Sequence, residues 1–172
     1  MYFIGNKKIG NGMPCYIIFE AGPTHQGFDG AKKLIEAAAK AGADAIKFQM
    51  IDPNRIIYDR SQQIEFEVFN KKKGSITKKE SLYKILKRRS LSFDEWRELK
   101  LLCDKLKICF ICTVGFDDEI EFLKEIQCQS IKIASADVNH FPLIKKAAQN
   151  KVNIQIDTGS STLSEIKEAV KI

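Results

Sequence analysis

Charged side chains recur where short apolar segments of this 172-residue sequence end. Lys47 and Lys132 lie inside two such segments, Glu20 closes another, and Asp157 stands near the end of a fourth. Burial of an ammonium group in an apolar strand is unfavourable unless an anion or a carboxylate pairs with it. The two lysines together predict an anion-binding site, whereas a structural hydrogen bond at a strand end explains any one of these residues equally well.

Five β-type segments alternate with helical patterns along the chain. The predicted strands cover residues 16–20, 45–49, 108–113, 130–135 and 152–158. Apolar residues at i, i+3, i+4 and i+7 predict helices between them, and Ser92 with Glu95 forms a capping box at the start of one helix. This alternation is typical of an α/β fold with a parallel sheet and right-handed crossovers.

The carboxyl ends of parallel strands are where barrels and open α/β sheets build their sites. We therefore expect five polar side chains to converge at one end of the sheet: Glu20, Lys47, Thr113, Lys132 and Asp157. In the second strand, alternation places Lys47 and Gln49 on one face of the sheet, opposite Ile46 and Phe48.

The length predicts a single domain without a linker. It falls short of the ~250 residues of a closed (β/α)8 barrel, and residues 165–172 form a helical pattern with no capping glycine. We therefore interpret the chain as part of a longer one. About thirty residues after Asp52 show no clear pattern before helical spacing resumes at Leu82.

The net charge of +6 is concentrated in residues 71–107, which carry 13 Lys and Arg against 5 Asp and Glu. The lysines at 71–73 and 78–79 are expected in a loop around Gly74 and Ser75. We interpret the excess as a solvated basic face, with attraction of an anionic substrate as the alternative. Nucleic acid is not expected as a partner because no aromatic residues interleave with the lysines to stack on bases.

Membrane and export signals are lacking in the sequence. No apolar run approaches the roughly 18 residues of a membrane span, and the start of the chain lacks the apolar core of a signal peptide. Five cysteines without a signal sequence indicate reduced thiols. We expect a cytoplasmic protein with no membrane partner.

Other candidate residues carry weaker signals. Cys109 and Cys112 have the spacing of zinc ligands, but on a strand they point to opposite faces, so no metal site is predicted. His25, in the loop after the first strand, is a candidate substrate contact. His140 is better explained as a solvent-exposed turn residue.

Several segments, in this order, resemble the N-acetylneuraminate (sialic acid) synthase family. They are residues 18–27 (IFEAGPTHQG), 41–49 (AGADAIKFQ), 81–83 (SLY), 110–113 (FICT), 132–137 (KIASAD) and 157–159 (DTG). The resemblance covers nearly the whole chain, and the segment after Asp52 contributes least to it.

The resemblance implies a (β/α)8 barrel of TIM type. Residues 1–172 would be its N-terminal part, with about five of the eight βα units, while the C-terminal barrel half and an antifreeze-like domain would be absent. It implies condensation of phosphoenolpyruvate with an N-acetylated amino sugar (N-acetylmannosamine type) to a nine-carbon 3-deoxy-2-ulosonic acid such as sialic acid, with release of phosphate.

The same resemblance assigns roles to individual residues. Glu20 and Asp137 would be catalytic. The substrate-binding residues would be Lys47, Gln49, Thr113, Lys132, Ser135 and His25. A divalent metal, manganese or magnesium, is implied for the complete enzyme, a homodimer, but its ligands are not expected in this chain.

Some positions depart from the family. Asp157 stands where Ser or Thr is usual, and Asp137 where Glu is usual, which bears mainly on the choice of sugar. The alternatives are a synthase of legionaminic, pseudaminic or another 3-deoxy acid, or a non-catalytic fragment that retains only anion binding. We expect residues 1–172 alone to be inactive.

Overall fold

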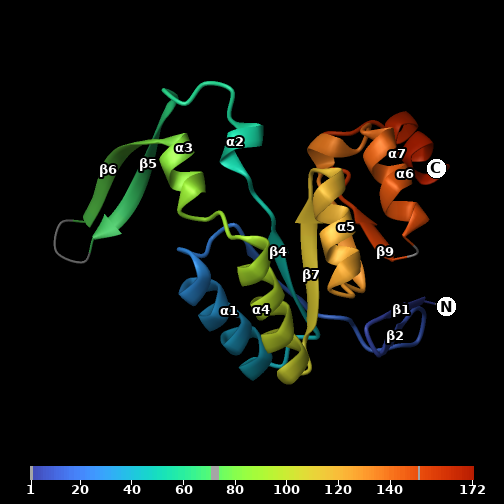
Figure 1. Cartoon of the computed structure of the whole chain (residues 1–172). Coiled ribbons are helices and arrows are strands. Elements are labelled where there is room, and N and C mark those ends of the chain that lie inside the picture. The colour runs from blue at the N-terminus through green and yellow to red at the C-terminus, as the bar shows by residue number, and fades with distance from the viewer. Residues whose placement is uncertain (1, 71–73, 151) are drawn as a thin grey trace.

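Five parallel strands form the central sheet of the chain (Figure 1). The structure is a computed structural model and describes residues 2–70, 74–150 and 152–172. The strands, in sheet order, are β3 (Ile18–Gly22), β4 (Ala45–Gln49), β7 (Cys109–Val114), β8 (Ser130–Ile133) and β9 (Asn153–Ile156). Their order in the sheet follows their order in the sequence, so the sheet has no point at which the strand order reverses. The prediction of five parallel strands is confirmed.

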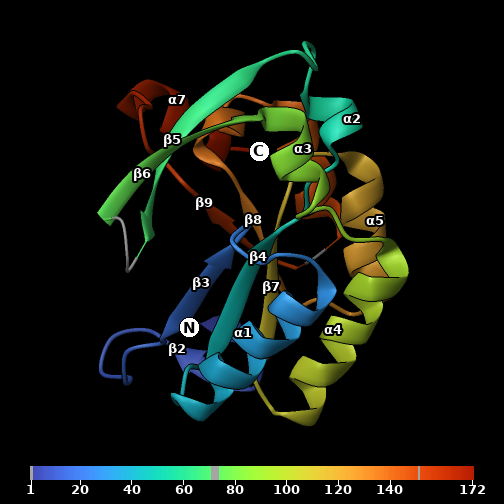
Figure 2. The same cartoon turned by 90° about the vertical axis from the view of Figure 1, so that its left-hand side faces the viewer.

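A helix follows each of these strands, directly or after an insertion. The helices are α1 (Phe28–Lys40), α4 (Phe93–Lys105), α5 (Asp117–Glu125), α6 (Phe141–Gln149) and α7 (Leu163–Val170). Figure 2 shows α1, α4 and α5 along one side of β3, β4 and β7. The capping box predicted for α4 is present, because the Ser92 hydroxyl accepts from the Glu95 amide while the Glu95 carboxylate accepts from the Ser92 amide.

The hydrophobic core lies between the sheet and these helices. Ile46 and Phe48 of β4 are fully buried and belong to the same cluster as Ile35 of α1 and Trp96 and Leu99 of α4. Phe48 packs edge-on against Trp96, with 5.6 Å between ring centroids. Because alternate residues of a strand point to opposite faces, the residues between these core positions are directed to the other face of the sheet.

Two hairpins and two short helices add to this frame, and of these the sequence patterns predicted only the helical segment that begins at Leu82. The first hairpin pairs β1 (Tyr2–Ile4) with β2 (Lys7–Ile9), and the second pairs β5 (Gln63–Asn70) with β6 (Gly74–Ser81). The short helices α2 (Pro53–Ile56) and α3 (Leu82–Lys87) flank the second hairpin. The stretch after Asp52, for which the sequence showed no clear pattern, thus contains α2, β5 and β6.

The second hairpin also corrects the predicted place of the basic residues. Lys78 and Lys79 lie on β6 and not in a loop, and they face Phe66 and Glu65 of β5 across the hairpin. The lysines at 71–73 lie outside the described residues. The hairpin lies between α2 and α3 in the sequence, and β6 contacts α3 (Figure 1).

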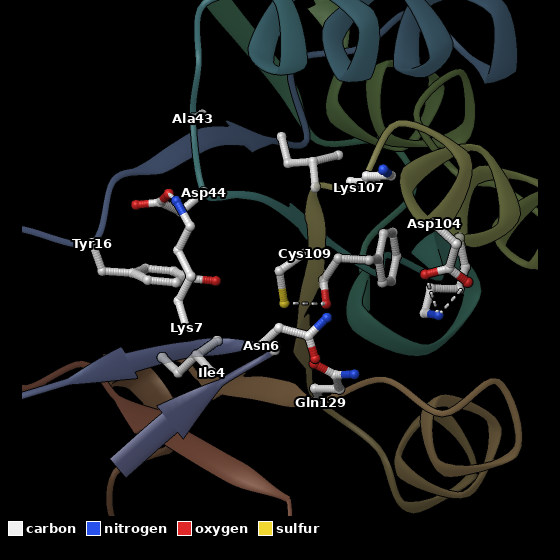
Figure 3. A pocket seen from close by; sticks show the side chains of 14 residues that line it. Ile4, Asn6, Lys7, Tyr16, Ala43, Asp44, Asp104, Lys107, Cys109 and Gln129 are labelled. Atoms are coloured by element: carbon white, nitrogen blue, oxygen red, sulfur yellow. Dashed lines mark hydrogen bonds and ion pairs between the residues drawn. The ribbon is translucent and has the colours of Figure 1, made fainter. Parts of the chain in front are cut away.

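The first hairpin is fastened to the amino end of the sheet. Lys7 forms an ion pair with Asp44, and the Asp44 carboxylate accepts a 2.7 Å hydrogen bond from the Ile17 amide. The Asn153 side chain donates to the Phe3 carbonyl at 2.6 Å. A pocket of about 520 Å³ lies next to this attachment. Figure 3 shows Lys7 and Asp44 among its lining side chains, together with Tyr16 and Cys109. Among the described residues, no helix is long and apolar enough to cross a membrane.

Candidate functional site

Two rows of side chains cross the sheet on the face opposite the core. Strand register aligns the first row as Glu20, Lys47, Ile111, Ser130 and Asn153. The second row, nearer the carboxyl ends of the strands, is Gln49, Thr113, Lys132 and Gln155. Neighbours in register on parallel strands point the same way. The two lysines therefore share one face, as the sequence predicts.

Lys47 forms an ion pair with the neighbouring strand. Its ammonium nitrogen lies 2.8 Å from Glu20 Oε2, and the two residues are direct partners in the β3–β4 register. The Lys47 side chain is only 14% exposed, while that of Glu20 is 57% exposed. The lysine is thus largely withdrawn from water, and its carboxylate partner is not.

Lys132 repeats this arrangement on the same face, between β8 and the end of β9. Its ammonium nitrogen donates to Asp157 Oδ2 at 2.5 Å, and its side chain is also 14% exposed, against 48% for Asp157. Asp157 follows β9 directly, and its amide continues the ladder by donating to the Ile133 carbonyl at 3.1 Å. Two residues beyond Gln155, it therefore faces the same way as Lys132.

Hydroxyl and amide groups lie between and around the two lysines. Thr113 is buried and stands in register between Gln49 and Lys132. The fully buried Ser130 accepts a 3.0 Å hydrogen bond from the Gln155 side chain. Neither Ser130 nor Gln155 was predicted from the sequence. The alternation at 130/132 and 153/155 places both on the sheet face that carries Lys47 and Lys132, the lysine face.

Ser135 and Asp137 occupy the turn of 3₁₀ helix that follows β8, η1 (Ser135–Asp137). Both residues are half-buried. A side chain on Gly159, in the segment after β9, would begin 3.6 Å from the Ser135 hydroxyl, in ordinary contact. Ser135 therefore lies beside the segment that carries Asp157, at the carboxyl end of the sheet.

His25 lies away from the lysine face. It is 2% exposed and packs edge-on against Phe48 and Trp96 in the core, with centroid separations of 5.9 and 6.0 Å. Neither ring nitrogen makes a hydrogen bond within the described chain. Burial lowers the pKa of His25, so the neutral ring is favoured. Burial of the ring between Phe48 and Trp96 does not support the substrate contact expected for His25.

The remaining candidates stay outside the site. Cys112 is buried and belongs to the core on one face of β7, while the half-buried Cys109 is directed to the other. His140 is exposed and precedes α6. In the described ranges, no three His, Cys, Asp or Glu side chains come together in a way that could hold a metal ion.

Known proteins are similar to this chain in sequence and in fold. Residues 34–172 match the NeuB family. An N,N'-diacetyllegionaminic acid synthase from Legionella pneumophila is 33% identical over 168 residues, which are 96% of this chain and 46% of that protein. Human N-acetylneuraminate-9-phosphate synthase is 33% identical over 174 residues, with 96% and 45% covered.

A solved structure of a related protein is also similar to this chain. The N-acetylneuraminic acid (sialic acid) synthetase from Leptospira borgpetersenii, in complex with citrate, superposes with a TM-score of 0.82 at 30% identity, covering 99% of this chain and 53% of that one. The chain spans about half the length of the curated relatives it matches. Since the family match covers most of the residues and the relatives cover nearly all of them, the chain belongs to the NeuB family.

Proposed function

We propose that this chain forms the phosphoenolpyruvate-binding part of a synthase that condenses phosphoenolpyruvate with an N-acetylated amino sugar. The product would be a nine-carbon 3-deoxy-2-ulosonic acid of the sialic acid type. Relatives named as sialic, legionaminic and pseudaminic acid synthases support this class of product. The acceptor of N-acetylmannosamine type remains one choice among these.

The observation that carries the proposal is the pair of lysines on one sheet face. Each ammonium group is largely shielded from water, at 14% side-chain exposure, and has one carboxylate partner among the described residues. Phosphoenolpyruvate bears a carboxylate and a phosphate, so two separated cations suit its two charged ends. Lysine is a common phosphate ligand because its ammonium group has three donors and acts as a point charge.

We also propose that the sheet is the first five strands of a (β/α)8 barrel of TIM type. Consecutive strand order, a helix after each strand and polar rows on the face opposite the helices all support this. The two rows would then line the barrel interior, with the second row nearer its carboxyl end, where barrel enzymes build their sites. Activity would require the further polypeptide that the longer relatives possess.

In the proposed reaction, C3 of phosphoenolpyruvate forms a bond with the aldehyde carbon of the open-chain sugar. The aldehyde oxygen gains a proton, water adds at C2, and phosphate leaves as the C2 ketone forms. Lys47 and Lys132 would hold the anion, and Thr113 and Ser135 would donate hydroxyl hydrogen bonds to it. Glu20 and Asp137 would exchange protons near the reacting carbons, and Gln49 would contact the sugar.

The resemblance implies manganese or magnesium and a homodimer for the complete enzyme. The described residues do not fit such an ion, because they hold no group of three candidate ligands. We therefore assign no step of the reaction to a metal. His25 is also left out of the proposed site, because it is enclosed by Phe48 and Trp96.

Titration of the chain with phosphoenolpyruvate tests the anion site. Lys47→Met and Lys132→Met should each weaken binding about tenfold or more, since a charge-assisted hydrogen bond contributes about 1.5–3 kcal/mol. Lys100→Met is a matched control, because Lys100 is 12% exposed and pairs with Asp104 at 2.7 Å, but lies on α4. Unchanged binding in both lysine variants would refute the site.

A second assay tests the need for a larger barrel. Residues 1–172 are incubated with phosphoenolpyruvate, N-acetylmannosamine and manganese, and product is followed by mass spectrometry. We expect no multiple turnovers from this chain. Multiple turnovers would show that an incomplete barrel is the wrong interpretation, and a panel of N-acetylated sugars would then identify the acceptor.

A further inference from the structure

The charges on the lysine face cancel. Lys47 and Lys132 contribute two positive charges, and their partners Glu20 and Asp157 contribute two negative ones. An anion that enters this face therefore meets two ion pairs and not two unpaired ammonium groups. The overall charge of +6 comes from residues elsewhere in the chain.

The pair at Lys132 is held by the end of a strand. The Lys132 ammonium group donates to Asp157 Oδ2 and is only 14% exposed. Asp157 reaches Lys132 from the end of β9, where the backbone is still held by the hydrogen bond to Ile133. An anion bound to the same ammonium group would lie close to the Asp157 carboxylate and be repelled by it.

From this geometry we propose that Asp157 competes with the anionic substrate for Lys132 and thereby sets the affinity of the site. The inference rests on the anion site proposed above. When the substrate binds, the Asp157 carboxylate gives up its contact with Lys132. Its 48% exposure allows this, because the released carboxylate can be hydrated without crossing the core. Asp157 is thus a residue that controls affinity through Lys132, not a catalytic residue.

A positioning role and a competing role for Asp157 predict opposite changes in anion affinity when its carboxylate is removed. If the carboxylate mainly held Lys132 in place for the substrate, its removal would weaken binding. If it competes, its removal strengthens binding. The sign of the change therefore separates the two roles, and general damage to the fold would not raise the affinity.

The test compares Asp157→Asn, Asp157→Glu and the unaltered chain in titrations with inorganic phosphate and with phosphoenolpyruvate. Asp157→Asn should bind both anions about tenfold more tightly, since a part-buried ion pair is removed. Asp157→Glu keeps the competing carboxylate and should stay within about threefold of the unaltered chain. Lys132→Met combined with Asp157→Asn should abolish the gain.

Glu121→Gln is the matched control for the loss of one negative charge. Glu121 pairs with Lys146 at 2.5 Å and is 49% exposed, nearly the values of Asp157, but lies on α5 outside the sheet face. It should leave anion affinity unchanged. A gain in Glu121→Gln equal to that in Asp157→Asn would overturn the inference, because it would show an effect of net charge alone.

The other outcomes are equally decisive. Unchanged, weaker or undetectable phosphate binding by Asp157→Asn overturns the competition. Tighter phosphate binding together with no preference for phosphoenolpyruvate supports the competition while removing the proposed substrate. Lysine-dependent binding of phosphoenolpyruvate that is insensitive to Asp157 leaves the proposed function in place and rejects this inference.

Discussion

The attachment of the first hairpin gives a prediction that depends only on the structure. Asp44→Ala removes a carboxylate that is 7% exposed, pairs with Lys7 and accepts from the Ile17 amide at 2.7 Å. A hydrogen bond to a charged group contributes about 1.5–3 kcal/mol. The ion pair adds little because the Lys7 side chain is 65% exposed. We therefore expect a loss of about 2 kcal/mol in the free energy of unfolding at pH 7.

The loss should depend on pH in a defined direction. Hydrogen bonds that the Lys7 ammonium and the Ile17 amide donate to Asp44 lower the pKa of this carboxylate below its usual range. A carboxylate with a lowered pKa stabilises the fold fully above its unfolded pKa of about 3.9, and this stabilisation disappears as the pH falls through the folded pKa. The difference between the two proteins should thus be constant from about pH 7 to pH 5 and shrink below about pH 4.

Urea unfolding of both proteins at several pH values, followed by circular dichroism, measures this difference. Thermal unfolding at pH 7 should show a decrease of about 4–8 °C, from about 2–4 °C per kcal/mol for a domain of this size. Asp94→Ala is the control, because Asp94 pairs with Arg97 at 2.6 Å but is 91% exposed. Equal losses in the two variants, or a difference that grows in acid, would refute the reasoning.

Two further predictions concern buried groups. Glu119 is 4% exposed and accepts from the amides of Gly115 and Phe116, and burial is the main cause that raises its pKa. Glu119→Gln should therefore be neutral or stabilising at pH 7, whereas Glu119→Ala should cost about 1–3 kcal/mol in urea unfolding; the reverse order would contradict this account. Iodoacetamide should label the exposed Cys15 in the folded chain, and mass spectrometry should find the buried thiols labelled only after unfolding: Cys103, Cys112 and Cys128. Rapid labelling of these three in the folded state would show that the core is open.

The parallel sheet was predictable because its signals are local. The apolar run in each strand, the helical spacing between strands and the Ser92–Glu95 capping box each involve residues close in sequence. The shared face of Lys47 and Lys132 followed from alternation and the common direction of the strands. These features need no knowledge of which side chains meet across the sheet.

The second hairpin was missed although its first strand carries a signal. Residues 64–68 alternate apolar and acidic side chains, Ile-Glu-Phe-Glu-Val, which is the pattern of a half-buried strand. Its partner strand is rich in lysine and gave no such pattern. A two-stranded hairpin depends on pairing as much as on the sequence of each strand, so one recognisable strand was not enough.

The fate of His25 depends on contacts that the sequence does not contain. A histidine in a loop after a strand is a reasonable substrate ligand by type. Its ring is instead enclosed by Phe48, from the next strand, and Trp96, from a helix about seventy residues later in the chain. The ring is buried because α4 packs against the sheet and brings Trp96 next to His25.

The pairing of charges on the lysine face changes how the basic composition should be understood. The two lysines that suit an anion are neutralised at short range by Glu20 and Asp157. Long-range attraction of an anion must therefore come from other residues, and residues 71–107 carry most of the excess positive charge of the chain. Such attraction depends on salt because exposed charges are screened over about 10 Å at 0.1 M ionic strength. Competition at Lys132 acts over a single contact of 2.5 Å between partly buried groups and is screened much less. The association rate of an anion would thus be controlled by exposed charges elsewhere in the chain. Its affinity would be controlled by Asp157.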